Sequence, residues 1–169
     1  MNDALWHRLD LFARALFPFL ITLMLAVLMA LPLRLPGLST IMPAFTLIAV
    51  YYWAVHRPQL MPIWAVFVIG LMQDLLSGGP VGVAIITLLC TQALIVWQRK
   101  IFASAPFALI WFIFMLAAAA AMTLMWILAC IGLMAYLDPR PIVFQYLLTV
   151  AVYPFFAWAM VRGRRLFAH

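Results

Sequence analysis

The chain has very few acidic residues. It contains no glutamate, and its four carboxylate side chains are all aspartates, in a sequence of 169 residues of which only 8% are charged. General acid–base catalysis, a metal centre or a proton relay needs at least two polar groups that converge. Only Asp74 lies inside an apolar segment, none of the three histidines does, and no serine has a plausible base nearby. The sequence therefore predicts a protein that is not an enzyme and that carries no metal and no cofactor.

Cysteine is also scarce. Cys90 and Cys130 both lie within apolar runs, which favours small apolar packing residues over a disulfide or a metal site. The first long apolar run lacks a small-x-small cleavage site before polar sequence, so we expect an uncleaved span and not a secretory signal.

Apolar residues dominate what remains. They make up 70% of the chain, and the mean hydropathy is +1.19. A water-soluble domain with this balance would expose one continuous apolar surface, so the composition predicts an all-α integral membrane protein. At about 20 residues per span, the length allows six transmembrane helices and no separate soluble domain. The net charge of +6 does not indicate nucleic acid, because the ten Lys and Arg residues are scattered over loop positions.

The pattern predicts a single polytopic membrane domain over residues 1–169. Residues 3–17 alternate polar and apolar positions at helical spacing and predict an amphipathic helix in the lipid headgroup region, most simply an anchor for the first span and alternatively a partner-binding helix. The spans are expected at about 16–33, 41–55, 61–76, 81–98, 105–137 and 142–161.

The basic residues predict the orientation. With six spans and both termini in the cytoplasm, eight of the ten basic residues lie inside and only Arg34 and Arg140 lie outside, as the positive-inside rule requires. The same topology brings five tryptophans to the cytoplasmic boundary, where indole rings are enriched: Trp6, Trp53, Trp64, Trp97 and Trp158.

The fifth span is unusually long. Its roughly 33 uncharged residues would form about 50 Å of helix, against a hydrocarbon core of about 30 Å. We expect it either to tilt strongly or to project beyond the outer surface, where it could dock a periplasmic partner. The small residues Ala117–Ala121 permit close helix approach, either inside the protein or against another protein.

The stretch Gly70–Gly82 is the candidate site. A carboxylate in a membrane helix is costly, so Asp74 is expected to be buried against protein and to have a role. Gly70, Asp74 and Gly78 would share one face if the helix continued that far. Three readings stay open: Asp74 ties the hairpin together through hydrogen bonds or one arginine, contacts a partner, or handles a ligand or proton. The candidate partners within the chain are Gln73, Gln92, Arg34 and Arg140.

Two further features accompany this stretch. Tyr52 and Trp53, followed by Arg57 and Pro58, are typical of interfacial aromatics with a basic residue that sets topology. Pro154 interrupts the sixth span and is expected to bend it, because proline removes a helical hydrogen bond.

These residues resemble those of a known family, rod shape-determining protein MreD of the bacterial inner membrane. The resemblance covers residues 52–82: Tyr52-Trp53 and Arg57-Pro58, then an apolar helix, then a pattern similar to the family's G-x-x-x-D-x-x-x-G-x-P-x-G. The matching positions of that pattern are Gly70, Asp74, Gly78, Pro80 and Gly82.

The resemblance implies a non-catalytic scaffold in lateral peptidoglycan synthesis that maintains rod cell shape. It implies that the protein acts together with MreC, MreB, RodA and the elongation penicillin-binding transpeptidase. It also implies the fold of the S-components of energy-coupling vitamin transporters, six helices around a central cavity. That kinship provides the alternative, a substrate-binding vitamin transporter subunit, for which Ala26-x-x-x-Ala30 would be a docking pair.

Overall fold

The computed structural model of the protein describes residues 19–28, 43–98 and 105–166. All regular structure in these ranges is helical, which confirms the predicted all-α class. The elements are a helix at Phe19–Leu28, α2 at Phe45–His56, the short 3-10 helix η1 at Pro58–Leu60, α3 at Ile63–Ser77, α4 at Val83–Trp97, α6 at Phe107–Leu133 and α7 at Arg140–Leu166. The predicted interfacial helix at residues 3–17 and the loop that carries Arg34 lie outside the described residues.

Proline and glycine set the helix ends. Pro62 and Pro106 precede α3 and α6 as N-cap residues, where the fixed φ of proline suits a helix start and its missing N–H costs nothing. Gly78 follows the last residue of α3, and Gly82 precedes the first residue of α4. Each apolar segment expected from the sequence overlaps one described helix.

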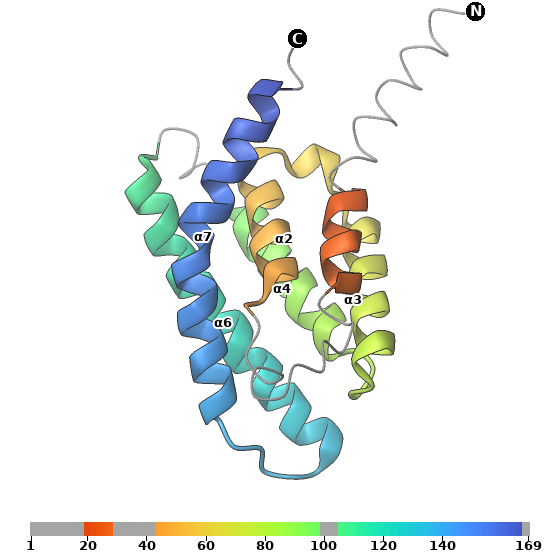
Figure 1. Cartoon of the computed structure of the whole chain (residues 1–169). Coiled ribbons are helices and arrows are strands. Elements are labelled where there is room, and N and C mark those ends of the chain that lie inside the picture. The colour runs from red at the N-terminus through yellow and green to blue at the C-terminus, as the bar shows by residue number, and fades with distance from the viewer. Residues whose placement is uncertain (1–18, 29–42, 99–104, 167–169) are drawn as a thin grey trace, which may run out of the picture.

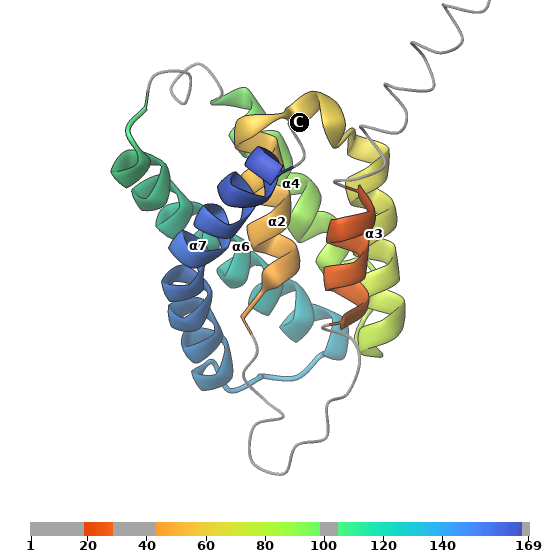
Figure 2. The same ribbon diagram turned by 45° about the horizontal axis from the view of Figure 1, so that its top comes forward.

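From α2 onward, the long helices alternate in direction (Figures 1 and 2). The C-terminal ends of α2 and α7 lie at one end of the bundle, and the α3–α4 turn and the α6–α7 connection lie at the other (Figure 1). Arg57, directly after α2, is therefore at the opposite end from Arg140, the first residue of α7. This arrangement is compatible with the predicted topology.

Two helices are long and apolar enough to cross a membrane by length and composition, Phe107–Leu133 and Arg140–Ala159, while the other apolar helices have 10–17 residues. The α6 helix ends at Leu133 and not near residue 137, because the chain turns at Met134. It runs obliquely across the bundle (Figures 1 and 2). Near its end, a Cβ atom placed on Gly132 would lie 2.7 Å from the Pro80 Cβ in the α3–α4 turn. The last turn of α6 therefore lies against the α3–α4 turn.

The core is centred on α2. Nine consecutive residues, Thr46–Ala54, are buried, and a helix buried on all sides is apolar on all sides. Tyr51 packs against Phe114 of α6 and Tyr153 of α7, at ring-centroid distances of 4.9 and 5.6 Å. The Tyr51 hydroxyl also donates a 2.9 Å hydrogen bond to the Ile110 carbonyl oxygen. Aromatic packing thus joins α2 to both long helices.

The interpretation of Tyr52 and Trp53 as interfacial aromatics is wrong. Tyr52 is 0% exposed and Trp53 4% exposed, so protein covers both rings. Trp64, Trp97 and Trp158 are exposed, as an interfacial position requires, and Trp6 lies outside the described residues.

The small residues of α6 pack inside the protein. Ala117, Ala118 and Ala121 are buried, which confirms internal packing as the use of this run. Both cysteines are free thiols, but only Cys130 is partly buried. Cys90 is exposed on α4, so it does not belong to the core formed by the described residues.

Candidate functional site

The α3–α4 hairpin buries Asp74, which is 3% exposed. Asp74 lies in the last turn of α3, and its carboxylate accepts hydrogen bonds from backbone N–H groups at the start of α4. Its Oδ2 accepts from Gly82 at 2.8 Å and from Ile85 at 3.4 Å, and its Oδ1 accepts from Ala84 at 2.9 Å. The acid therefore faces protein and is engaged by backbone amides.

These contacts make Asp74 the cap of a helix that it does not belong to. An N-cap side chain normally accepts from the second and third helical N–H groups, which in α4 are those of Ala84 and Ile85. The N-cap position of α4 is Gly82, which has no side chain to do this. The positive end of the α4 dipole also attracts the carboxylate, whereas the C-terminal end of α3 by itself repels it. Asp74 is thus stable in α3 only while α4 starts beside it.

The glycines of the hairpin each satisfy a separate backbone requirement. Gly78 has φ +66° and Gly82 has φ +108°, values that residues with a Cβ atom rarely adopt. Gly70 is needed for space, because a Cβ atom there would lie 2.8 Å from the Ile85 Cα. The close approach of α3 and α4 brings the Asp74 carboxylate within reach of the α4 amides.

Pro80 connects the α3–α4 turn to α6. It lies against Gly132 of α6, where an added Cβ would be 2.7 Å from the Pro80 Cβ and 2.9 Å from its Cγ. Five positions predicted from the sequence, Gly70, Asp74, Gly78, Pro80 and Gly82, are therefore brought together in one hairpin. Gly78 is left-handed and outside α3, so it does not share a helical face with Gly70 and Asp74.

The side-chain partners expected for Asp74 are wrong wherever the structure describes them. Gln92 Nε2 donates to the Met61 carbonyl oxygen at 2.6 Å and so joins α4 to the start of α3. Arg140 is exposed, and its backbone N–H donates to Asp138 at 3.0 Å. The hydrogen bonds of Asp74 go to backbone N–H groups, which every sequence contains and which carry no signal in it.

The second group of predicted residues lies at the other end of the bundle. Tyr52 stacks on His56 at a centroid distance of 4.3 Å, and His56 Nδ1 lies 3.0 Å from the Tyr52 carbonyl oxygen. Arg57 is exposed, and Pro58 starts η1. Tyr52, Trp53, Arg57 and Pro58 thus support the α2–α3 connection and do not join the Asp74 hairpin in one site.

Two interhelical hydrogen bonds have only faint signals in the sequence. Thr149 of α7 accepts from the Ala44 backbone N–H at 2.9 Å and donates to the Gln145 carbonyl oxygen at 2.6 Å, so its hydroxyl ties α7 to the start of α2. The Trp111 indole N–H donates to the Val150 carbonyl oxygen at 3.3 Å. A threonine and a tryptophan in apolar helices are hints of such bonds, but their partners are backbone atoms.

The arrangement is suited to holding helices together. The one carboxylate of the hairpin is occupied by backbone donors, and the part of the chain that the structure describes contains no group of three or more His, Cys, Asp or Glu residues that could hold a metal ion. The hairpin brings five predicted residues together and turns the Asp74 carboxylate toward protein.

Comparison with protein families identifies a relationship. The family model described as rod shape-determining protein MreD matches residues 11–161, most of the chain, and confirms the resemblance found on residues 52–82. Neither the curated proteins nor the solved structures gave a significant match.

Proposed function

The chain belongs to the MreD family of rod shape-determining proteins, and on that basis we propose that it is a non-catalytic, multi-pass scaffold of the bacterial inner membrane. In this role it assists lateral peptidoglycan synthesis during cell elongation. Its proposed partners are MreC and, through MreC or directly, MreB, RodA and the elongation penicillin-binding transpeptidase. Membership of the family itself implies a role in determining rod shape.

The observation that most directly supports a scaffold is that backbone N–H groups of α4 occupy the Asp74 carboxylate. The carboxylate accepts from the N–H groups of Gly82 and Ala84 at 2.8 and 2.9 Å. A general acid or base must reach a substrate proton, whereas these lone pairs point at backbone. The acid is used to fix two helices relative to each other, which is what a scaffold needs.

The distribution of exposed residues around the hairpin suggests how a partner would meet it. Asp74 is buried, so a partner does not contact its carboxylate. The turn instead exposes Val81, and the last turn of α3 exposes Leu75 and Leu76. We propose that Asp74 acts on partner capture indirectly, by holding this surface in one shape.

The vitamin transporter alternative receives less support from the same helices. One partly open cavity between α2, α3, α4 and α6 has a volume of about 30 Å³, whereas pockets for small-molecule ligands typically measure about 300–1,000 Å³. A vitamin would not fit there without a rearrangement of the helices.

Depletion in a rod-shaped host, followed by complementation, tests the proposal. We expect loss of rod shape on depletion, rescue by the wild-type chain, and failure of Asp74→Leu to restore shape or to copurify MreC. Asp138→Leu is the matched control, since it removes an exposed acid at the start of α7, and it should rescue. Rescue of depleted cells by an external vitamin, or full rescue by Asp74→Leu at normal protein level, would overturn the scaffold role.

A further inference from the structure

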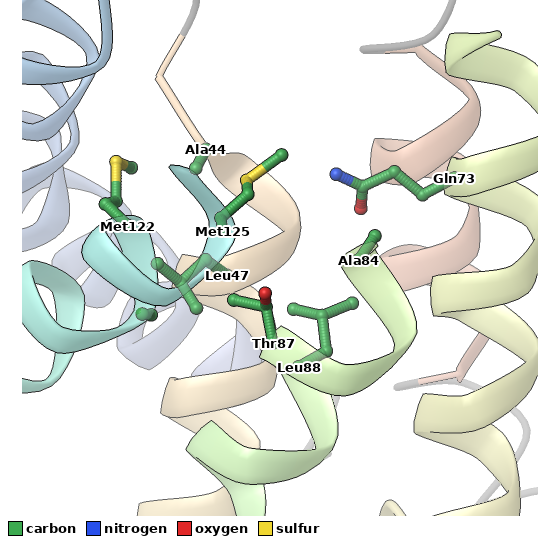
Figure 3. A pocket seen from close by; sticks show the side chains of 9 residues that line it. Ala44, Leu47, Gln73, Ala84, Thr87, Leu88, Met122 and Met125 are labelled. Atoms are coloured by element: carbon green, nitrogen blue, oxygen red, sulfur yellow. The ribbon is translucent and has the colours of Figure 1, made fainter. Parts of the chain in front are cut away.

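A small cavity lies beside the Asp74 cap, where four helices meet. Its volume is about 30 Å³, and Figure 3 shows the side chains around it. Most of the wall is apolar. It comes from the start of α2, from α4 and from the middle of α6: Ala44, Leu47, Ala84, Leu88, Ala121, Met122 and Met125. Two polar side chains complete it, Gln73 of α3 and Thr87 of α4.

Two polar oxygen atoms in this wall can each accept a hydrogen bond. The Gln73 Oε1 atom is buried and has no hydrogen-bond partner among the described residues. The Thr87 hydroxyl donates its proton to the Val83 carbonyl oxygen at 2.7 Å, so its oxygen can only accept a further hydrogen bond. Gln73 projects from α3 toward α4 and α6, and Thr87 rises from α4 into the same space (Figure 3). The cavity thus offers two acceptors.

We propose that this cavity is a binding site for one or two ordered water molecules. A water molecule has two protons and can donate to both Gln73 Oε1 and Thr87 Oγ1. A cavity needs about 10–15 Å³ for one water and at least two polar partners, and both conditions are met. A lipid chain cannot satisfy an amide oxygen, and an anion would be repelled by two acceptors. A hard cation would need more oxygen ligands than this wall supplies.

The location gives the water a structural role. Gln73 is adjacent to Asp74, which caps α4, and Thr87 is one turn into α4. Met122 and Met125 belong to α6, and Ala44 precedes α2. Water bound here hydrogen-bonds to α3 and α4 within the hairpin and lies against the methionines of α6. Methionine side chains are adaptable, so this contact tolerates small shifts of α6.

X-ray radiolytic labelling of the full-length protein in lipid nanodiscs tests the site. Radicals formed from ordered water oxidise nearby methionines, and mass spectrometry with fragmentation assigns the sulfoxide to each residue. The chain supplies matched pairs: Met122 against Met61, both buried, and Met125 against Met115, both partly buried. We expect Met122 and Met125 to be labelled at least about threefold faster than their counterparts, since only they border the polar cavity. Equal labelling within both pairs would overturn the proposal.

Substitutions of the polar lining residues distinguish water bound at this site from water that reaches the methionines by general hydration of the protein. Gln73→Leu should lower the labelling of Met122 and Met125 to that of Met61 and Met115, because the Thr87 hydroxyl alone is too few polar partners to hold a water molecule. Gln145→Leu makes the same change at a partly buried position of α7 that does not line the cavity, and it should leave the rates unchanged. Thr87→Val keeps the side-chain shape and provides the second variant if Gln73→Leu does not fold. Fast labelling that persists in both folded variants contradicts the site.

Discussion

The indole N–H of Trp111 donates to the carbonyl oxygen of Val150 at 3.3 Å. Val150 lies four residues before Pro154, which sits inside α7 and has no N–H to donate to that carbonyl. The proline therefore frees a backbone acceptor in an apolar helix, and Trp111 of α6 occupies it. Pro154 therefore creates a contact between α6 and α7, and α7 continues through it to Leu166.

Loss of this contact should depend on the proline. We expect Trp111→Phe to lower the free energy of unfolding by about 0.5–1.5 kcal/mol, the range for one hydrogen bond. In a Pro154→Ala background the new N–H can donate to Val150, so Trp111→Phe should cost less. Unfolding in mixed micelles of all four combinations measures this coupling. Trp97→Phe, at an exposed tryptophan, should have almost no effect, and strictly additive costs of Trp111→Phe and Pro154→Ala would contradict the pairing.

Removal of the Asp74 carboxylate should destabilise the hairpin in a graded way. Asp74→Leu leaves the N–H groups of Ala84 and Gly82 without an acceptor, and we expect a loss of about 3 kcal/mol or more. Asp74→Asn retains one acceptor oxygen, so its cost should be nearer 1–2 kcal/mol, roughly that of a lost helix cap. Thermal unfolding in detergent measures both. The order Leu worse than Asn is the decisive result, and an equal cost for the two would show that the hydrogen bonds matter less than the charge.

The glycines of the turn should respond to alanine according to their φ angles. Gly78→Ala and Gly82→Ala place a Cβ on left-handed backbone, at φ +66° and +108°, and each should cost about 1–2 kcal/mol. No atom lies within 4 Å of the added Cβ at either position, so the cost arises from the backbone alone. Gly79→Ala is the control, because the nearest atom to its added Cβ is 3.8 Å away, and its effect should stay below about 0.5 kcal/mol. Similar melting temperatures for all three variants would contradict this account.

Two other glycines should differ in whether a second change can rescue them. Gly70→Ala directs its Cβ at the backbone of Ile85, 2.8 Å from the Cα, and should cost about 1–3 kcal/mol by separating α3 from α4. Gly132→Ala meets only the ring of Pro80, so Pro80→Ala should relieve it. In that background the higher helix propensity of alanine should even favour Gly132→Ala. Unfolding measurements on the single and double variants test this, and rescue of Gly70→Ala by Pro80→Ala would be inconsistent with the geometry.

The helices and the burial of Asp74 could be predicted from the sequence, whereas the partners of Asp74 could not. A single acid in apolar sequence must be buried against protein because lipid cannot solvate it. The position of Asp74 therefore indicates that the hairpin around it is packed against protein. Its hydrogen-bond donors are backbone N–H groups, which every residue except proline has, so residue types pointed to Gln92 and Arg140 instead. Gly78 and Gly82 are visible in the sequence beside Asp74, but their left-handed conformations are properties of the folded backbone.

The error at Tyr52 and Trp53 has a similar physical origin. Lipid and the protein interior are both apolar, so composition does not distinguish an aromatic ring that faces one from a ring that faces the other. The burial of Thr46–Ala54 in α2 depends on α4, α6 and α7 packing around it. The use of Pro154 was missed for the same reason, because the donor, Trp111, is far away in the sequence.

The cap formed across the hairpin has a consequence for how the protein enters the membrane. In the proposed membrane topology, a lone α3 would bring an unsolvated carboxylate into the hydrocarbon and a lone α4 would bring uncapped amides, and each is costly there. Only when residues 82–85 have left the ribosome can the two costs cancel. We therefore expect the translocon to release these two segments to the bilayer as a pair, with α3 waiting for α4 during synthesis.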